Sequence, residues 1–141
     1  MKNVFRYVYD RIIDSLTGQE YQKRTATDLI IASNSETPSS SGTFSLVNFS
    51  VPAGAECIIG DVDFGASGAG TAEVTVTVGS VTITRYLYLS AAGFIENQHD
   101  IERDPFFAFV NATTASVTVN MNVLSAATTI NYIGNVAYVI R

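Results

Sequence analysis

His99 is the only histidine of the chain, so it is the only imidazole that could act as the base in nucleophilic catalysis. A catalytic serine needs such a base within hydrogen-bond distance, and the acidic segment 96–104 around His99 could supply the third member of a triad. The Gly-x-Ser-x-Gly elbow that often presents such a serine is absent from the sequence. We therefore predict that the chain is not an enzyme and that segment 96–104 is a solvated loop at a sheet edge or sandwich tip.

Carboxylates at two places could hold a cation. Segment 96–104 is rich in oxygen ligands but does not have the spacing of an EF-hand loop. Asp61 and Asp63 would project from the same side of a strand, and either group could bind a cation or simply keep a sheet surface soluble. A single histidine without a cysteine pair argues against zinc, so we predict no metal and no other cofactor.

Two further patterns could bind small molecules. The glycine-rich segment 65–70 is followed by neither a Lys-Ser/Thr pair nor a helix, so we interpret it as a turn and not as a phosphate-binding loop. Tyr86 and Tyr88 are two residues apart in a predicted strand, which places their rings side by side. These rings could form a platform for a sugar, although packing against threonines on a half-exposed sheet is the favoured interpretation.

The cysteine and the two Asn-x-Ser/Thr patterns do not indicate the disulfides or glycosylation of a secreted protein. Cys57 is the only cysteine, which excludes an intrachain disulfide, and its apolar neighbours predict a buried thiol. Asn48 and Asn111 begin two Asn-x-Ser/Thr patterns. The N-terminus has no long apolar run, so we expect no signal peptide or membrane anchor, and we interpret both patterns as chance occurrences.

Charge is sparse and unevenly distributed in the 141 residues, which suffice for one domain with its own core. Residues 1–28 contain five basic and four acidic residues, whereas the remainder contains three basic and nine acidic residues. Nucleic-acid binding requires a concentrated basic surface. We therefore exclude nucleic acid as a partner.

The stretch from Thr71 to Leu89 gives the strongest structural prediction. Valines alternate with threonines up to Gly79-Ser80, and the alternation then resumes through Leu89. This period of two predicts a β-hairpin with one apolar face and a type II′ turn. Further short alternating segments follow Thr43, so we predict an all-β antiparallel sandwich, most simply an eight-stranded jelly roll over residues 43–141. An immunoglobulin-like sandwich is the alternative, but the chain lacks the Trp and cysteine pair typical of it, and Gly134 predicts a bulge or break in the last strand.

The first 42 residues are predicted to be an N-terminal arm with a flexible Ser-rich loop at 33–42. Residues 4–9 are extended and aromatic, residues 10–16 suit a helical turn, and residues 29–32 could form a short strand. The arm could dock on a neighbouring subunit or larger assembly, or it could be the first strand and a short helix of the same domain. The Ser-rich stretch could likewise be a linker or a surface loop of the sandwich.

A run from Val51 to Phe94 carries a family resemblance. A Pro-Ala-Gly turn, a strand, a small-residue loop, a Thr/Val hairpin and the segment Leu-Tyr-Leu-Ser-Ala-Ala-Gly follow one another. This order resembles jelly-roll decoration (cement) proteins of tailed-phage capsids. The resemblance implies a homotrimer on the capsid surface of a virion, made in the host cytoplasm, with the major capsid protein as its partner.

The resemblance also implies that the arm makes the contacts with the capsid or with neighbouring subunits. The expected contact residues are Phe5, Arg6, Tyr7, Tyr9, Ile12, Ile13 and Leu16. Two other functions fit the same pattern: a single jelly-roll subunit that forms the shell itself, and a carbohydrate-binding or adhesin module.

Overall fold

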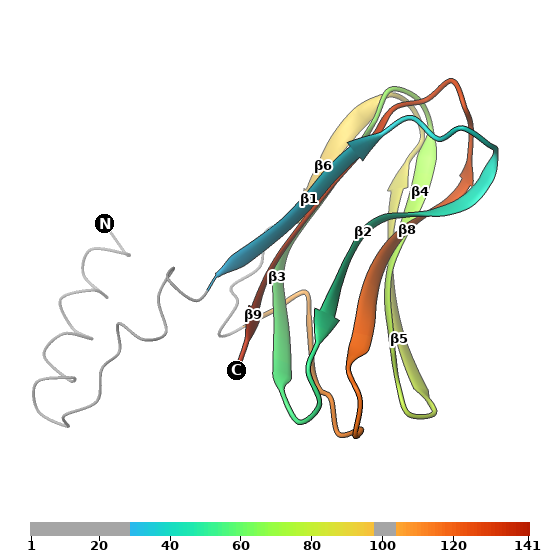
Figure 1. The fold of residues 1–141 in the computed structure, drawn as a ribbon. Helices are drawn as coiled ribbons and strands as arrows, with labels where there is room; N and C mark the ends of the chain where they lie inside the picture. The colour runs from blue at the N-terminus through green and yellow to red at the C-terminus, as the bar shows by residue number, and fades with distance from the viewer. Residues whose placement is uncertain (1–28, 98–103) are drawn as a thin grey trace, which may run out of the picture.

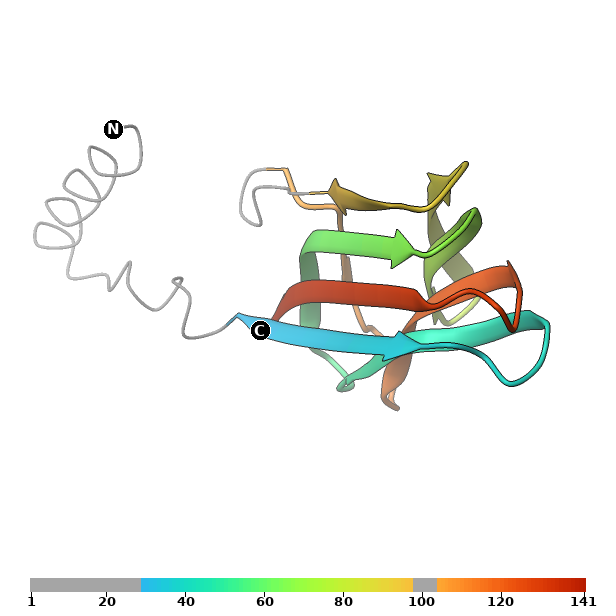
Figure 2. The ribbon, with the colours of Figure 1, turned by 90° about the horizontal axis from the view of Figure 1, so that it is seen from above.

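The structure is a computed structural model that describes residues 29–97 and 104–141. The described residues form two antiparallel β-sheets that face one another (Figures 1 and 2). The strands are β1 (Ile30–Glu36), β2 (Gly42–Val51), β3 (Glu56–Ala66), β4 (Gly70–Val78), β5 (Val81–Leu89), β6 (Gly93–Asn97), β7 (Phe107–Val110), β8 (Val117–Ala126) and β9 (Tyr132–Ile140). In this part of the chain no helix is long and apolar enough to cross a membrane.

The order of the strands is that of a jelly roll. One sheet, here called the β1 sheet, has the order β1-β9-β3-β6, and β7 also pairs with β3. The other, the β5 sheet, has the order β2-β8-β4-β5. The chain changes sheet at every connection except the β4–β5 hairpin and the β6–β7 segment. The short strands β6 and β7 both pair with β3 and share one strand position beside it. The predicted all-β sandwich is confirmed, with eight strand positions arranged as two Greek keys.

The predicted domain boundary at residue 43 differs from the structure. Strand β1 pairs with β9 over its whole length, from Ile30 opposite Tyr138 to Glu36 opposite Tyr132. The sandwich therefore includes the segment from Ile30, and residues 33–36 are strand and not loop. Only residues 37–41 connect β1 to β2, which makes the Ser-rich stretch a surface loop within the sandwich.

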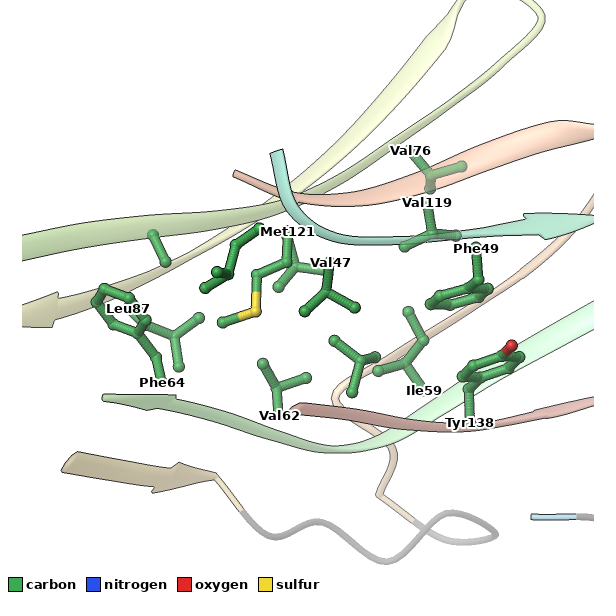
Figure 3. Close-up of a cluster of buried hydrophobic side chains, with 14 of the residues drawn as sticks. Val47, Phe49, Ile59, Val62, Phe64, Val76, Leu87, Val119, Met121 and Tyr138 are labelled. Carbon is green, nitrogen blue, oxygen red and sulfur yellow. The ribbon is translucent and has the colours of Figure 1, made fainter. Parts of the chain in front are cut away.

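The core between the sheets is built by the alternation that the sequence predicts. Val74 and Val76 of β4 point inward, and so do Val119, Met121 and Val123 of β8. Phe49 of the β5 sheet stacks on Tyr138 of the β1 sheet, with ring centroids 3.6 Å apart and planes 5° from parallel (Figure 3). Aromatic rings bury large apolar areas, so this pair joins the two sheets directly.

The predicted β4–β5 hairpin is confirmed. Val78 pairs with Val81, which leaves Gly79 and Ser80 as the two-residue turn. Gly79 has a φ of 62°, whereas Ser80 is not among the residues with positive φ. A positive φ at the first central position only is the pattern of a type II′ turn, and glycine adopts it without steric cost.

Cys57 is a buried thiol, as predicted. Its side chain has no solvent exposure and belongs to the core cluster. Burial raises the pKa of the Cys57 thiol to about 12. The thiol therefore stays protonated at neutral pH, which is the unreactive form.

Candidate functional site

Several predicted site residues lie outside the described residues. They are His99 and the seven predicted arm contacts, Phe5, Arg6, Tyr7, Tyr9, Ile12, Ile13 and Leu16. Their roles stay predictions. The sites that can be built from geometry are the two outer faces of the sandwich.

The outer face of the β5 sheet is polar and carries the tyrosine pair. Its positions alternate with the core residues of β2, β8, β4 and β5. We call it the tyrosine face; its residues are Ser45, Asn48, Ser50, Thr71, Glu73, Thr75, Thr77, Thr82, Thr84, Tyr86, Tyr88, Thr118, Asn120, Asn122 and Leu124. Hydroxyl and amide groups dominate this surface, and Glu73 is its only charged residue.

Tyr86 and Tyr88 lie side by side on one strand. That strand, β5, is the edge strand of this sheet; Figure 1 shows its place in the fold. Their ring centroids are 6.2 Å apart and their planes differ by 26°. Tyr86 is 52% exposed and Tyr88 is 67% exposed, so both side chains present surface to solvent that other residues of the chain do not cover. The predicted adjacency of the two rings is confirmed.

Polar groups extend from the tyrosines across the sheet. Tyr86 is paired in register with Glu73 on β4, and Glu73 is paired with Asn122 on β8. The Asn122 side-chain amide donates a hydrogen bond to Glu73 Oε1 over 3.3 Å. An aromatic ring, a carboxylate and an amide therefore form one continuous row on a rigid sheet surface.

Threonine pairs hold the hairpin on the same face. The hydroxyls of Thr75 and Thr84 are 3.1 Å apart, and those of Thr77 and Thr82 are 2.8 Å apart. Cross-strand threonine pairs stabilise an antiparallel sheet. They fix β5 against β4 and so position the tyrosine rings.

The outer face of the β1 sheet carries large hydrophobic residues among polar ones such as Ser33, Ser35 and Asn135. Ile31, Phe94, Val110 and Ile133 are large exposed hydrophobic residues on its strands. Three further hydrophobic residues are buried without belonging to the core cluster: Ile58, Ala137 and Val139. We call these seven residues the apolar outer face; its four exposed members are the part that is available for a protein–protein contact.

Asp63 interrupts the apolar outer face. It lies between Asn135 on β9 and Glu96 on β6, and its Oδ1 atom is buried without a hydrogen-bond partner. Desolvation raises the pKa of the Asp63 carboxyl above its ordinary value of 3.8, the charges of Glu96 and Asp61 raise it further, and a hydrogen bond from Asn135 opposes the rise. Within residues 29–97 and 104–141, no cluster of three potential metal ligands surrounds Asp61 and Asp63.

We expect Asp63→Asn to stabilise the protein at neutral pH. A carboxyl whose pKa is raised by folding favours the folded state only while it is protonated, so its contribution is lost as pH rises from about 3.8 through the folded-state pKa. The melting temperature of the variant should exceed that of the wild type by roughly 2 °C at pH 7, and the difference should vanish below pH 3.8.

Thermal unfolding of both proteins across this pH range measures the effect. Glu96→Gln is the matched variant, because it removes one of the charges that raise the pKa of Asp63. It should reproduce part of the stabilisation. A lower melting temperature for Asp63→Asn at neutral pH would contradict this account of the buried carboxylate.

Asn111 is a buried residue with a structural role. The sequence alone shows only that it begins an Asn-x-Ser/Thr pattern, which we interpret as a chance occurrence. Its side chain has no solvent exposure. Its amide donates hydrogen bonds to the carbonyl oxygens of Val51, Pro52 and Ala115 at 3.0, 3.1 and 2.9 Å. Its Oδ1 accepts hydrogen bonds from the Thr113 amide and hydroxyl at 3.1 and 2.6 Å. The threonine two residues later, which completes the glycosylation pattern, is also the signal of an Asx turn.

Comparison with known proteins adds little to this picture. No protein-family model and no curated protein matches the chain. Among solved structures, the infectious bursal disease virus Gx strain aligns with 13% identity and a TM-score of 0.41 over 78% of this chain and 32% of the viral chain. TmCBM61 in complex with β-1,4-galactotriose aligns with 7% identity and a TM-score of 0.40 over 89% of this chain and 95% of the module.

The insecticidal crystal protein Cry2Aa aligns with 14% identity and a TM-score of 0.40 over 71% of this chain and 16% of that protein. The chain thus spans less than a third of the viral and insecticidal chains and nearly all of the carbohydrate-binding module. At these identities and TM-scores, the likenesses assign no function.

Proposed function

We propose that this protein is a virion structural protein that decorates a capsid lattice as a homo-oligomer, a trimer by the family resemblance. The observation that carries the proposal is that the segment with the family resemblance lies within a sandwich that has the strand order expected for that family. The segment from Val51 to Phe94, which resembles jelly-roll decoration proteins, corresponds to the strands from β3 to the start of β6 in a sandwich with jelly-roll strand order. The major capsid protein would be the partner, and the protein would have no catalytic role.

The apolar outer face supports adhesion as the mode of action. Ile31 is 64% exposed and Phe94 is 49% exposed, although both lie in regular strands. Burying the exposed part of such side chains at a contact is favourable by about 1–2 kcal/mol each. Anything that binds only the assembled lattice stabilises it by mass action, so a surface of this kind suits a protein that reinforces a shell.

The predicted arm is the second contact element. Its aromatic and aliphatic side chains would bury against adjacent subunits, in addition to the contact made by the apolar outer face of the sandwich. Because β1 starts at Ile30, removing residues 1–28 leaves all nine described strands in place. The arm can therefore be tested separately from the sandwich.

We expect deletion of residues 1–28 to weaken particle binding strongly without unfolding the sandwich. Loss of several buried apolar contacts should weaken co-sedimentation with capsids of the corresponding major capsid protein by at least about 100-fold. Circular dichroism and thermal unfolding should show that the β-sandwich is retained.

The full chain with Tyr7→Ser and Tyr9→Ser is the matched variant for this test, since it alters the arm without shortening it. It should also bind particles more weakly. Unimpaired binding of the truncated chain would contradict the role of the arm, whereas failure of the full chain to bind any particle would contradict the decoration function itself.

A further inference from the structure

We propose that the tyrosine face is a binding site for a neutral oligosaccharide, with Tyr86 and Tyr88 as the stacking surface and Glu73 and Asn122 as the hydrogen-bonding groups. This goes beyond attachment to a capsid, because it gives the decorating protein a ligand of its own. The site lies on the β5 sheet, whereas the apolar outer face lies on the β1 sheet. The two functions can therefore be separated by mutation.

The tyrosine pair supplies the stacking surface. The two rings are neighbours on one strand, with their centroids 6.2 Å apart and their planes 26° apart. An aromatic ring offers an apolar face for the C–H groups of a sugar, and the phenol hydroxyl offers a donor and an acceptor. Because both rings are more than half exposed, ligand binding requires no rearrangement of the core.

The row next to the tyrosines supplies the polar contacts. Glu73 is directly opposite Tyr86, and Asn122 is directly opposite Glu73. A carboxylate accepts hydrogen bonds from sugar hydroxyls, and an amide both donates and accepts them. The bond between Asn122 and Glu73 holds both groups in place before a ligand arrives, which lowers the entropy cost of binding.

The charge on the tyrosine face decides which ligands fit. The face contains no lysine or arginine. Arg85 lies between Tyr86 and Thr84 in sequence but on the other side of β5, opposite the inward-pointing Val74. Its guanidinium donates a hydrogen bond to the Thr84 carbonyl at 3.1 Å. A nucleic acid or an acidic polysaccharide would bring negative charge to a surface whose only charge is a carboxylate. A protein partner would bury more hydrophobic surface by binding the apolar outer face than by binding the tyrosine face. The combination of aromatic rings, hydroxyls and amides is complementary to an uncharged polyhydroxylated chain.

Binding of the full-length protein to a panel of neutral glucose-, galactose-, mannose- and xylose-based oligosaccharides tests the proposal. Positive ligands would be titrated by calorimetry and by tyrosine fluorescence, since the chain has no tryptophan. We expect Tyr86→Ala and Tyr88→Ala each to weaken binding by about 10-fold. The corresponding Phe variants should retain binding to within about threefold, because the ring is kept and one hydrogen bond is lost.

Two further variants separate this site from the rest of the surface. Glu73→Gln should weaken binding by about fivefold, because hydrogen bonds to a charged acceptor are the stronger ones. Phe94→Ala removes an exposed aromatic ring from the apolar outer face and should leave sugar affinity unchanged. Thermal unfolding confirms that each variant is folded.

Three results would overturn the proposal. The first is that no neutral oligosaccharide in the panel binds. The second is that binding survives the double Tyr86→Ala, Tyr88→Ala substitution. The third is that this double variant loses capsid binding, which would make the tyrosine face a lattice contact.

Discussion

A chain with alanine in place of Asn111 is expected to lose about 3 kcal/mol of unfolding free energy. The substitution removes the donor for the Val51 and Pro52 carbonyls and the acceptor for Thr113. Buried groups left without partners cost more than the average hydrogen bond contributes. It also removes the side-chain hydrogen bonds from the segment after β7 to the turn between β2 and β3, and leaves, among the described hydrogen bonds, only the backbone bonds of residue 111 to Gly54 and Ala55. Urea unfolding at equilibrium measures the loss.

Asn48→Ala is the control for this prediction. Asn48 begins the other Asn-x-Ser/Thr pattern, but its side chain is exposed and makes one 3.4 Å hydrogen bond to Ser45. Its replacement should change stability by less than about 0.5 kcal/mol. Equal effects of the two substitutions would show that burial of Asn111 does not matter, contrary to the structure.

Gly134→Val is expected to destabilise the protein by about 3 kcal/mol. A Cβ atom at Gly134 would lie 2.7 Å from Met121 Sδ, 2.9 Å from Leu46 Cδ2 and 3.1 Å from Val47 Cγ2. All three atoms belong to the opposite sheet, so an added side chain forces the two layers apart. Gly134→Ala should cost less, about 1–2 kcal/mol, because the side chains of Met121 and Leu46 can shift.

Gly93→Ala provides the comparison for Gly134. A Cβ atom there would lie 3.6 Å from Leu89 Cδ2, an ordinary contact, and the residue also belongs to a strand of the β1 sheet. Denaturant unfolding should show little change for this variant. A similar loss in both variants would mean that glycine at position 134 is needed for a reason other than the close approach of the sheets.

Gly134 also shows where sequence reasoning failed. Glycine in a predicted strand suggests a bulge or a break, yet β9 is continuous from Tyr132 to Ile140, and the register shift lies on β3 between Ile59 and Val62. The reason for the glycine is a residue on another strand, Met121, and no local pattern reveals that contact. By contrast, the β4–β5 hairpin was predictable because its turn and alternation are local.

Strand β1 was misjudged for a related reason. Residues 33–36 have the composition of a loop, and low-complexity Ser-rich segments are commonly flexible. Pairing with β9 provides the backbone hydrogen bonds that make them a strand, and β9 is about a hundred residues further along the chain. Asn34 adds a side-chain hydrogen bond to the Leu46 carbonyl at 3.0 Å. Tertiary pairing therefore overrides composition at this edge of the sandwich.

The candidate sites were predictable in part. The adjacency of Tyr86 and Tyr88 follows from strand periodicity, but Glu73 and Asn122 join them only through the strand order β8-β4-β5. The apolar outer face likewise combines residues from β1, β3, β6, β7 and β9. A surface assembled from non-consecutive strands has no signature in one stretch of sequence.

The mass of the full chain in solution tests the central claim most directly, because the proposed function requires association with copies of itself. Native mass spectrometry or light scattering at micromolar concentration should give a discrete homo-oligomer, and a trimer of the 15.1 kDa chain is the expected species. A chain that stays monomeric throughout, or that assembles alone into large closed particles, would contradict the decoration account; the second outcome would identify a shell-forming subunit instead.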